Sequence, residues 1–142
     1  MKTCLDFGEI LEIGRPQIDE LHRVGEAFPD ADSEEACGQF TIQVRRLEGI
    51  VLTNYRVAAA LARKGDDLRE VASLWASMSQ FCQAALQVLA QLKDRYPGCG
   101  TPELYDLVLD YKLAADKRYK GVAQELECLT TDLPKGLLPE LS

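Results

Sequence analysis

A regular spacing of apolar residues runs through residues 37–61. Eight positions follow one another at alternating intervals of three and four residues: Cys37, Phe40, Val44, Leu47, Val51, Asn54, Ala58 and Leu61. Only Asn54 among them is not apolar. Because this alternation keeps every side chain on one stripe of a helix, the segment is predicted to be a long helix that packs lengthwise against others.

Residues 3–28 carry a similar stripe with two glycines in it. Its members are Phe7, Leu11, Gly14, Ile18, Leu21, Gly25 and Phe28. Pro16 lies in the middle, and proline both lacks an amide hydrogen and clashes with the carbonyl four residues earlier. We predict a kinked helix or two short helices here. The unbroken spacing across Pro16 favours two pieces along one edge of a bundle.

Two more helices are predicted beyond Gly65, which is expected to end the second helix in a left-handed conformation. Asp66 or Asp67 is expected to cap the third helix, Asp67 having the capping-box spacing with Glu70, and Thr101 is expected to start the fourth after a turn at residues 97–100. The third stripe is Val71, Leu74, Met78, Phe81, Ala85, Val88 and Leu92, with an apolar row beside it that includes Trp75 and Cys82. The fourth is Leu104, Val108, Tyr111, Ala115, Tyr119, Val122, Leu126 and Leu129.

Short turns between long helices place neighbouring helices antiparallel. We therefore predict an all-α protein, an antiparallel up-down four-helix bundle whose first helix is kinked or broken near Pro16. The alternative is three long helices with an N-terminal arm. The bundle is expected to form a single domain over residues 1–133. Pro134 then stops the fourth helix, and residues 134–142 are expected to form an extended tail.

The net charge of −7 argues against a nucleic-acid-binding protein, which normally displays a basic stripe. The most basic stretch, residues 112–120, also contains Asp116. It is interpreted as a solvated helix face, with a phosphate- or acid-binding patch as the alternative. The first residues do not resemble a signal peptide, and no apolar run approaches the ~20 residues that a membrane span needs. We expect a cytoplasmic protein that does not bind membranes.

The five cysteines and one histidine do not form a recognisable metal or haem motif. We expect reduced thiols in the cytoplasm, no metal and no cofactor. Cys37, Cys82 and Cys128 lie on or beside apolar stripes, where cysteine behaves as a small hydrophobic residue. Cys99 lies between two glycines and is expected in an exposed turn, either as an incidental thiol or as a redox site.

His22 is the single histidine. A solvent-facing histidine on a bundle helix is the arrangement of histidine phosphotransfer domains, but the lysine that usually follows the histidine there is absent from Arg23-Val24-Gly25. A surface or interface histidine is therefore the preferred interpretation, with a phosphoacceptor as the alternative.

Asn54 is the polar residue on a core stripe. A buried amide costs stability unless it is hydrogen-bonded, and in coiled coils it fixes register or oligomeric state. Two roles for Asn54 are therefore considered. It specifies the register or oligomeric state of a partner, or it forms a hydrogen bond within the bundle or lies at its rim. Leu137, Leu138 and Leu141 in the tail could dock locally or contact a partner. These four are the predicted partner-binding residues.

The stripes specify a fold, and no catalytic motif accompanies them. We predict a non-enzymatic protein that acts through protein–protein contact or self-association, as an adaptor, chaperone-like or assembly subunit. One alternative is a signalling or small-ligand bundle, with His22 as phosphoacceptor or a ligand held near Asn54 and Trp75. Another is metal or redox sensing through Cys99.

Overall fold

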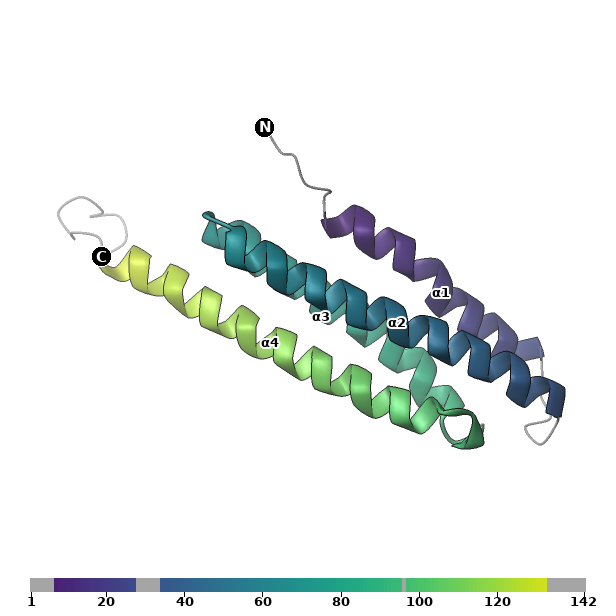
Figure 1. The fold of residues 1–142 in the computed structure, drawn as a ribbon. Helices are drawn as coiled ribbons and strands as arrows, with labels where there is room; N and C mark the ends of the chain where they lie inside the picture. The colour runs from purple at the N-terminus through teal and green to yellow at the C-terminus, as the bar shows by residue number, and fades with distance from the viewer. Residues whose placement is uncertain (1–6, 28–33, 96, 133–142) are drawn as a thin grey trace.

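The computed structural model of this chain describes residues 7–27, 34–95 and 97–132. Four α-helices make up most of them: α1 (Phe7–Ala27), α2 (Glu34–Lys64), α3 (Leu68–Leu92) and α4 (Thr101–Asp132). A short 3-10 helix, η1 (Pro97–Cys99), precedes α4. Successive helices run in opposite directions (Figure 1). The predicted antiparallel four-helix bundle is confirmed, and the described residues contain no strand.

α1 is one continuous helix that contains Pro16, so it does not form as two separate pieces. Pro16 is exposed, and there water can bond the carbonyl that loses its helical partner. The helix spans 21 residues and packs along both α2 and α3. This rules out the alternative in which three helices are joined by an N-terminal arm.

Gly14 and Gly25 let α1 approach its neighbours closely. A Cβ atom added at Gly14 would lie 2.9 Å from Ile50 Cγ2 on α2 and 3.0 Å from Phe81 Cε1 on α3. One added at Gly25 would lie 2.6 Å from Leu92 Cδ2. The two glycines of the first stripe are therefore packing positions at which a side chain would push the helices apart.

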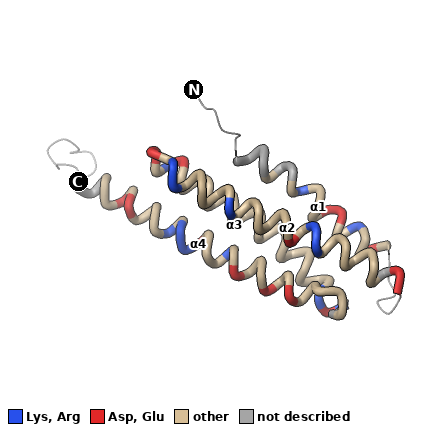
Figure 2. The backbone as a smooth tube through the Cα atoms, in the orientation of Figure 1, with Lys and Arg blue, Asp and Glu red and all other residues tan. Residues whose placement is uncertain are grey.

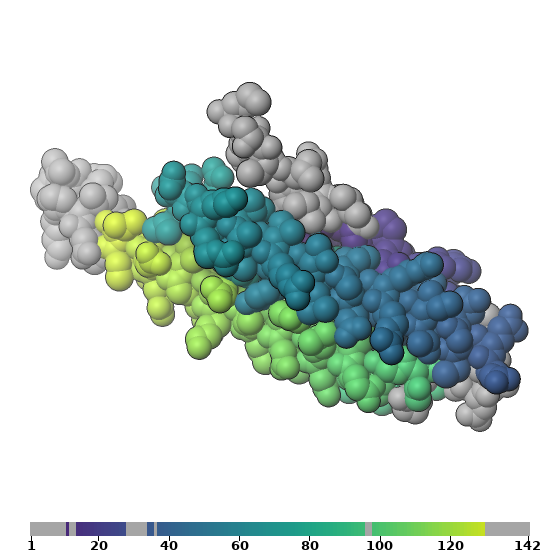
Figure 3. Space-filling model, in the orientation of Figure 1, coloured from purple at the N-terminus to yellow at the C-terminus, as the bar shows by residue number. Residues whose placement is uncertain are grey.

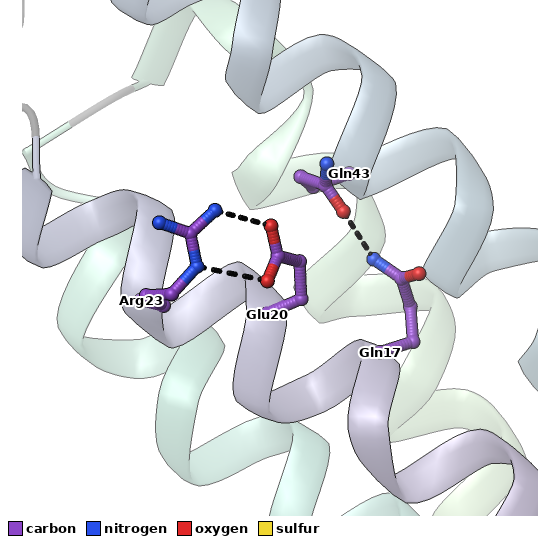
Figure 4. A network of polar contacts seen from close by, with 4 residues as sticks. All are labelled: Gln17, Glu20, Arg23 and Gln43. Atoms are coloured by element: carbon purple, nitrogen blue, oxygen red, sulfur yellow. Dashed lines mark hydrogen bonds and ion pairs between the residues drawn. The ribbon is translucent and has the colours of Figure 1, made fainter.

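A polar contact also joins α1 to α2. The amide of Gln17 donates a hydrogen bond to the side-chain oxygen of Gln43, which is buried (Figure 4). This bond offsets the cost of removing the Gln43 amide from water. The neighbouring pair of Glu20 and Arg23 lies on the exposed side of α1, where an ion pair contributes little to stability.

The stripe of α2 forms a wall of the core, as predicted. Phe40, Val44, Leu47, Val51 and Ala58 are buried, and Cys37 and Leu61 at its ends are half-buried. The wide apolar face of α3 is buried against the other helices, with Trp75, Met78, Phe81 and Leu89 among the largest buried side chains. A helix with so wide a buried face touches several neighbours, which is typical of a globular bundle.

The N-cap of α3 matches a predicted capping signal, whereas the conformation expected of Gly65 does not. The backbone N–H of Arg69 donates to Asp67 Oδ1 at 2.9 Å, so Asp67 is the N-cap of α3. Gly65 was expected in a left-handed conformation, and this is wrong: among the described residues only Gly100 has a positive φ, of 85°. A Cβ at Gly65 would lie 2.8 Å from Val71 Cγ2, so close packing of the turn is what requires glycine there.

Candidate functional site

The apolar stripe of α4 loses its cover partway along the helix. Leu104, Val108 and Ala115 are buried in the core. Beyond Ala115, no side chain from position 116 to position 129 is buried. The three-four spacing nevertheless continues through four more apolar residues, which we call the α4 C-terminal stripe: Tyr119, Val122, Leu126 and Leu129.

The exposure of this stripe increases at its ends. Val122 and Leu126 are half-buried, whereas Tyr119 is 41% and Leu129 is 58% exposed. An isolated exposed leucine is ordinary on a protein surface. A helical row that continues a core stripe is different, because its side chains point in the direction in which the rest of the helix is packed.

The register of α4 against α3 leaves the last turn of α4 uncovered. The Ser79 hydroxyl on α3 donates a hydrogen bond to Asp116 on α4, and the two helices are antiparallel. Since α3 starts only eleven residues before Ser79, its first turn lies level with about residue 127 of α4. The last turn of α4 therefore extends beyond the turn between α2 and α3, as Figures 1 and 3 show.

An aromatic cluster holds α4 in place just before this stripe. The Tyr55 ring on α2 lies 5.4 Å from the Trp75 ring on α3 and 4.7 Å from the Tyr111 ring on α4, between ring centroids. The Arg118 guanidinium lies 5.3 Å from the centre of the Trp75 ring, and its Nε donates to the Tyr55 hydroxyl at 3.2 Å. These contacts link three helices through one junction.

A second polar junction fixes the same register. Lys112 Nζ donates to Asp116 Oδ2 at 2.8 Å, beside the bond from Ser79. Partial burial raises the pKa of Asp116, but the hydrogen bonds from Lys112 and Ser79 outweigh it, so the pKa is held below its usual value. The carboxylate is therefore charged at neutral pH and keeps both donors.

Charges of opposite sign are separated along the second half of α4. Figure 2 shows a basic segment followed, toward the C-terminal end, by an acidic one. Lys117, Arg118 and Lys120 belong to the first, and Glu125 and Glu127 belong to the second. All five side chains are exposed.

Of the predicted partner-binding residues, Asn54 lies inside the bundle. Its side chain is 3% exposed, and among the described residues its Nδ2 has no hydrogen-bond partner. A partner could reach this amide only if the helices separated. Leu137, Leu138 and Leu141 lie outside the described residues, so the structure does not bring Asn54 together with them.

We expect the Asn54→Leu variant to be more stable by about 1–2 kcal/mol, because it removes a buried donor that makes no bond. The matched control is Gln43→Leu, which removes a buried amide that does accept a bond and should lose about 0.5–1.5 kcal/mol. Urea unfolding followed by circular dichroism measures both. A loss of stability for Asn54→Leu equal to that for Gln43→Leu would contradict this account.

The other sequence candidates are placed as follows. His22 is exposed on α1, with its Nε2 3.5 Å from Glu26 Oε1. Cys99 was expected in an exposed turn, and this is wrong: it is 6% exposed, because η1 folds it onto α2.

No group of three His, Cys, Asp or Glu side chains able to hold a metal occurs in the described ranges. None of the helices seen there could cross a bilayer, as each is too short or too polar.

The α4 C-terminal stripe can be recognised in the sequence, but its spacing predicts a core position for all of its residues. Its spacing is continuous with that of Leu104 to Ala115, so periodicity alone cannot separate the covered half from the uncovered half. How much of the end of α4 is covered depends on where α3 begins relative to it.

Comparisons of the chain with protein-family models, with curated proteins and with solved structures found no match.

Proposed function

We propose that this chain is a non-enzymatic assembly protein that acts through protein–protein contact at the α4 C-terminal stripe. The single observation that carries the proposal is that an apolar row continuous with the core is left without a buried residue beyond Ala115. The half-buried Val122 packs on the chain's own core, whereas the exposed Tyr119 and Leu129 leave apolar surface on which another protein can pack. The occupant that we propose is the same stripe of a second copy of the chain.

The spacing of the stripe supports pairing with itself. The intervals from Tyr119 to Val122, Leu126 and Leu129 are three, four and three residues, which read the same in both directions. When two copies pair antiparallel about a twofold axis, Tyr119 of each copy lies opposite Leu129 of the other, and Val122 lies opposite Leu126. Each large exposed side chain then packs against another from the second copy.

The charges beside the stripe are complementary in the same arrangement. Lys120 and Glu127 are seven residues apart and so lie on the same side of α4. In an antiparallel pair the basic segment of one copy runs beside the acidic segment of the other. In the register that pairs Tyr119 with Leu129, Lys120 of each copy lies level with residue 128 of the other, next to Glu127, and this attraction occurs twice.

Sedimentation velocity of the full chain over a range of concentrations tests the proposal. We expect a monomer–dimer equilibrium that Leu129→Asp weakens about tenfold or more, because it places a charge in the apolar contact. Leu113→Asp is a matched control: Leu113 is on the same helix, is 57% exposed against 58% for Leu129, and lies away from the stripe. It should leave the dissociation constant unchanged.

Two results would overturn self-pairing through α4. A wild-type chain that stays monomeric at roughly 100 µM would exclude a second copy as the occupant. Equal weakening by Leu113→Asp and Leu129→Asp would place the contact elsewhere. Circular dichroism of each variant at the working temperature confirms that it remains folded.

A further inference from the structure

Two thiols far apart in the sequence meet at one end of the bundle. Cys37 lies near the start of α2, and Cys99 is the last residue of η1. Their sulfur atoms are 3.0 Å apart, and both cysteines are free thiols. A disulfide bond is about 2.05 Å long, so the sulfurs need to move by only about 1 Å to bond.

The surroundings give a small oxidant access to this pair. Cys37 is half-buried and so partly open to solvent. Cys99 lines an open cavity of about 610 Å³ between α2, η1 and the start of α4. Polar and charged side chains form much of its wall, among them Thr41, Arg45, Glu48 and Glu103. A water-sized polar molecule can therefore enter as far as Cys99.

The backbone near Cys99 leaves room for the required movement. A Cβ at Gly98 would meet nothing within 4 Å, so there is open space beside the residue that precedes Cys99. Gly100 has a φ of 85°, a conformation that glycine adopts without strain. On the other side, the Thr41 hydroxyl donates to the Cys37 carbonyl at 2.8 Å and anchors that end of α2.

We propose that Cys37 and Cys99 form a dithiol site that hydroperoxides oxidise to an intramolecular disulfide, which then locks η1 onto α2.

The chemistry has two balanced steps. The Cys37 thiolate attacks one oxygen of hydrogen peroxide: an S–O bond forms, the O–O bond breaks, and the departing hydroxide takes up a proton to give water. The Cys99 sulfur then attacks the Cys37 sulfur: an S–S bond forms, the S–O bond breaks, and a second water leaves with the Cys99 proton. Two electrons pass from the two thiols to one peroxide.

The roles of the two cysteines follow from their exposure. Burial, together with the neighbouring Cys37 thiol, raises the pKa of Cys99 to about 11, so Cys99 is a thiol at neutral pH. The more accessible Cys37 is the sulfur that peroxide reaches first, and Cys99 resolves the product. Cys82 is fully buried, with a pKa raised to about 12 chiefly by burial, and is not expected to react.

The test treats the reduced full chain with hydrogen peroxide, then blocks the remaining thiols and identifies linked peptides by mass spectrometry. We expect a Cys37–Cys99 disulfide, a mass loss of two hydrogens and a melting temperature higher by about 5–15 °C, because the bond closes a long loop. Reduction with dithiothreitol should reverse all three changes.

Substitutions separate this site from ordinary thiol oxidation. In Cys99→Ser, and in Cys99→Ala in case a buried hydroxyl prevents folding, dimedone should trap a sulfenic acid at Cys37. In the wild type it should trap little, because Cys99 removes that species. Cys128→Ser is the control, since Cys128 is an exposed thiol on α4 that lacks a place in the proposed site. It should form the disulfide as the wild type does. Oxidation of Cys128 with Cys37 and Cys99 left as thiols would overturn the proposal.

Discussion

A Trp75→Ala variant is expected to lose about 3–5 kcal/mol of unfolding free energy, a large share of the roughly 5–15 kcal/mol that stabilises a folded domain. Trp75 is 2% exposed, and its ring contacts Tyr55 on α2 and Arg118 on α4. Removing it leaves a cavity where three helices meet and deprives the Arg118 guanidinium of its aromatic surface. Because Trp75 is the single tryptophan, circular dichroism and not fluorescence should follow the denaturant titration.

Two matched variants test whether the loss of unfolding free energy comes from the aromatic ring at this junction. Trp75→Phe keeps an aromatic ring at the junction and should lose clearly less than Trp75→Ala. Tyr119→Ala removes an aromatic side chain from the exposed part of α4 and should change monomer stability by about 0.5 kcal/mol or less. A loss below 1 kcal/mol for Trp75→Ala would show that the junction does not hold the bundle together.

Gly14→Ala is expected to destabilise the protein by about 1–3 kcal/mol, although alanine normally favours a helix. The added methyl group would lie 2.9 Å from Ile50 Cγ2 and 3.0 Å from the Phe81 ring. The Cγ2 methyl of Ile50 is close to the backbone and Phe81 is buried, so neither can move aside easily. The clash should push α1 away from α2 and α3.

Gly49→Ala is the matched control for this substitution. Gly49 lies inside α2 and is exposed, and a Cβ added there would meet nothing within 4 Å. Alanine there should stabilise the protein by about 0.5–1 kcal/mol, because it restricts the unfolded chain and favours the helix. Thermal unfolding of the two variants should therefore shift in opposite directions. A shift of the same sign in both would show that close packing at Gly14 does not matter.

The helices could be predicted from local signals. The stripe of α2, the Asp67 cap of α3 and the start of α4 near Thr101 each depend on residues within a few positions of one another. Such signals act in the same way wherever the helix is placed. Pro16 was the exception, because a solvent-facing proline can remain inside a helix that its neighbours hold in place.

Predictions from local sequence signals were wrong for residues whose surroundings are formed by distant segments of the chain. Cys99 lies between glycines and reads as a loop thiol, but packing of η1 brings it onto Cys37, 62 residues away. Gly65 occupies the position of a left-handed cap, but it is required by the side chain of Val71. Neither contact could be predicted from the periodicity of apolar residues in the sequence.

Four long amphipathic helices can be predicted from the amino-acid sequence alone, since the spacing of apolar residues is a property of each helix. How far each helix is covered depends on the contacts between helices. The contacts of Asp116 with Ser79 and Lys112 set α4 against α3 so that the last turn of α4 extends past the start of α3. Register is a relation between helices, established by side chains that meet only after the chain has folded, so the periodicity of α4 alone cannot predict where its cover ends.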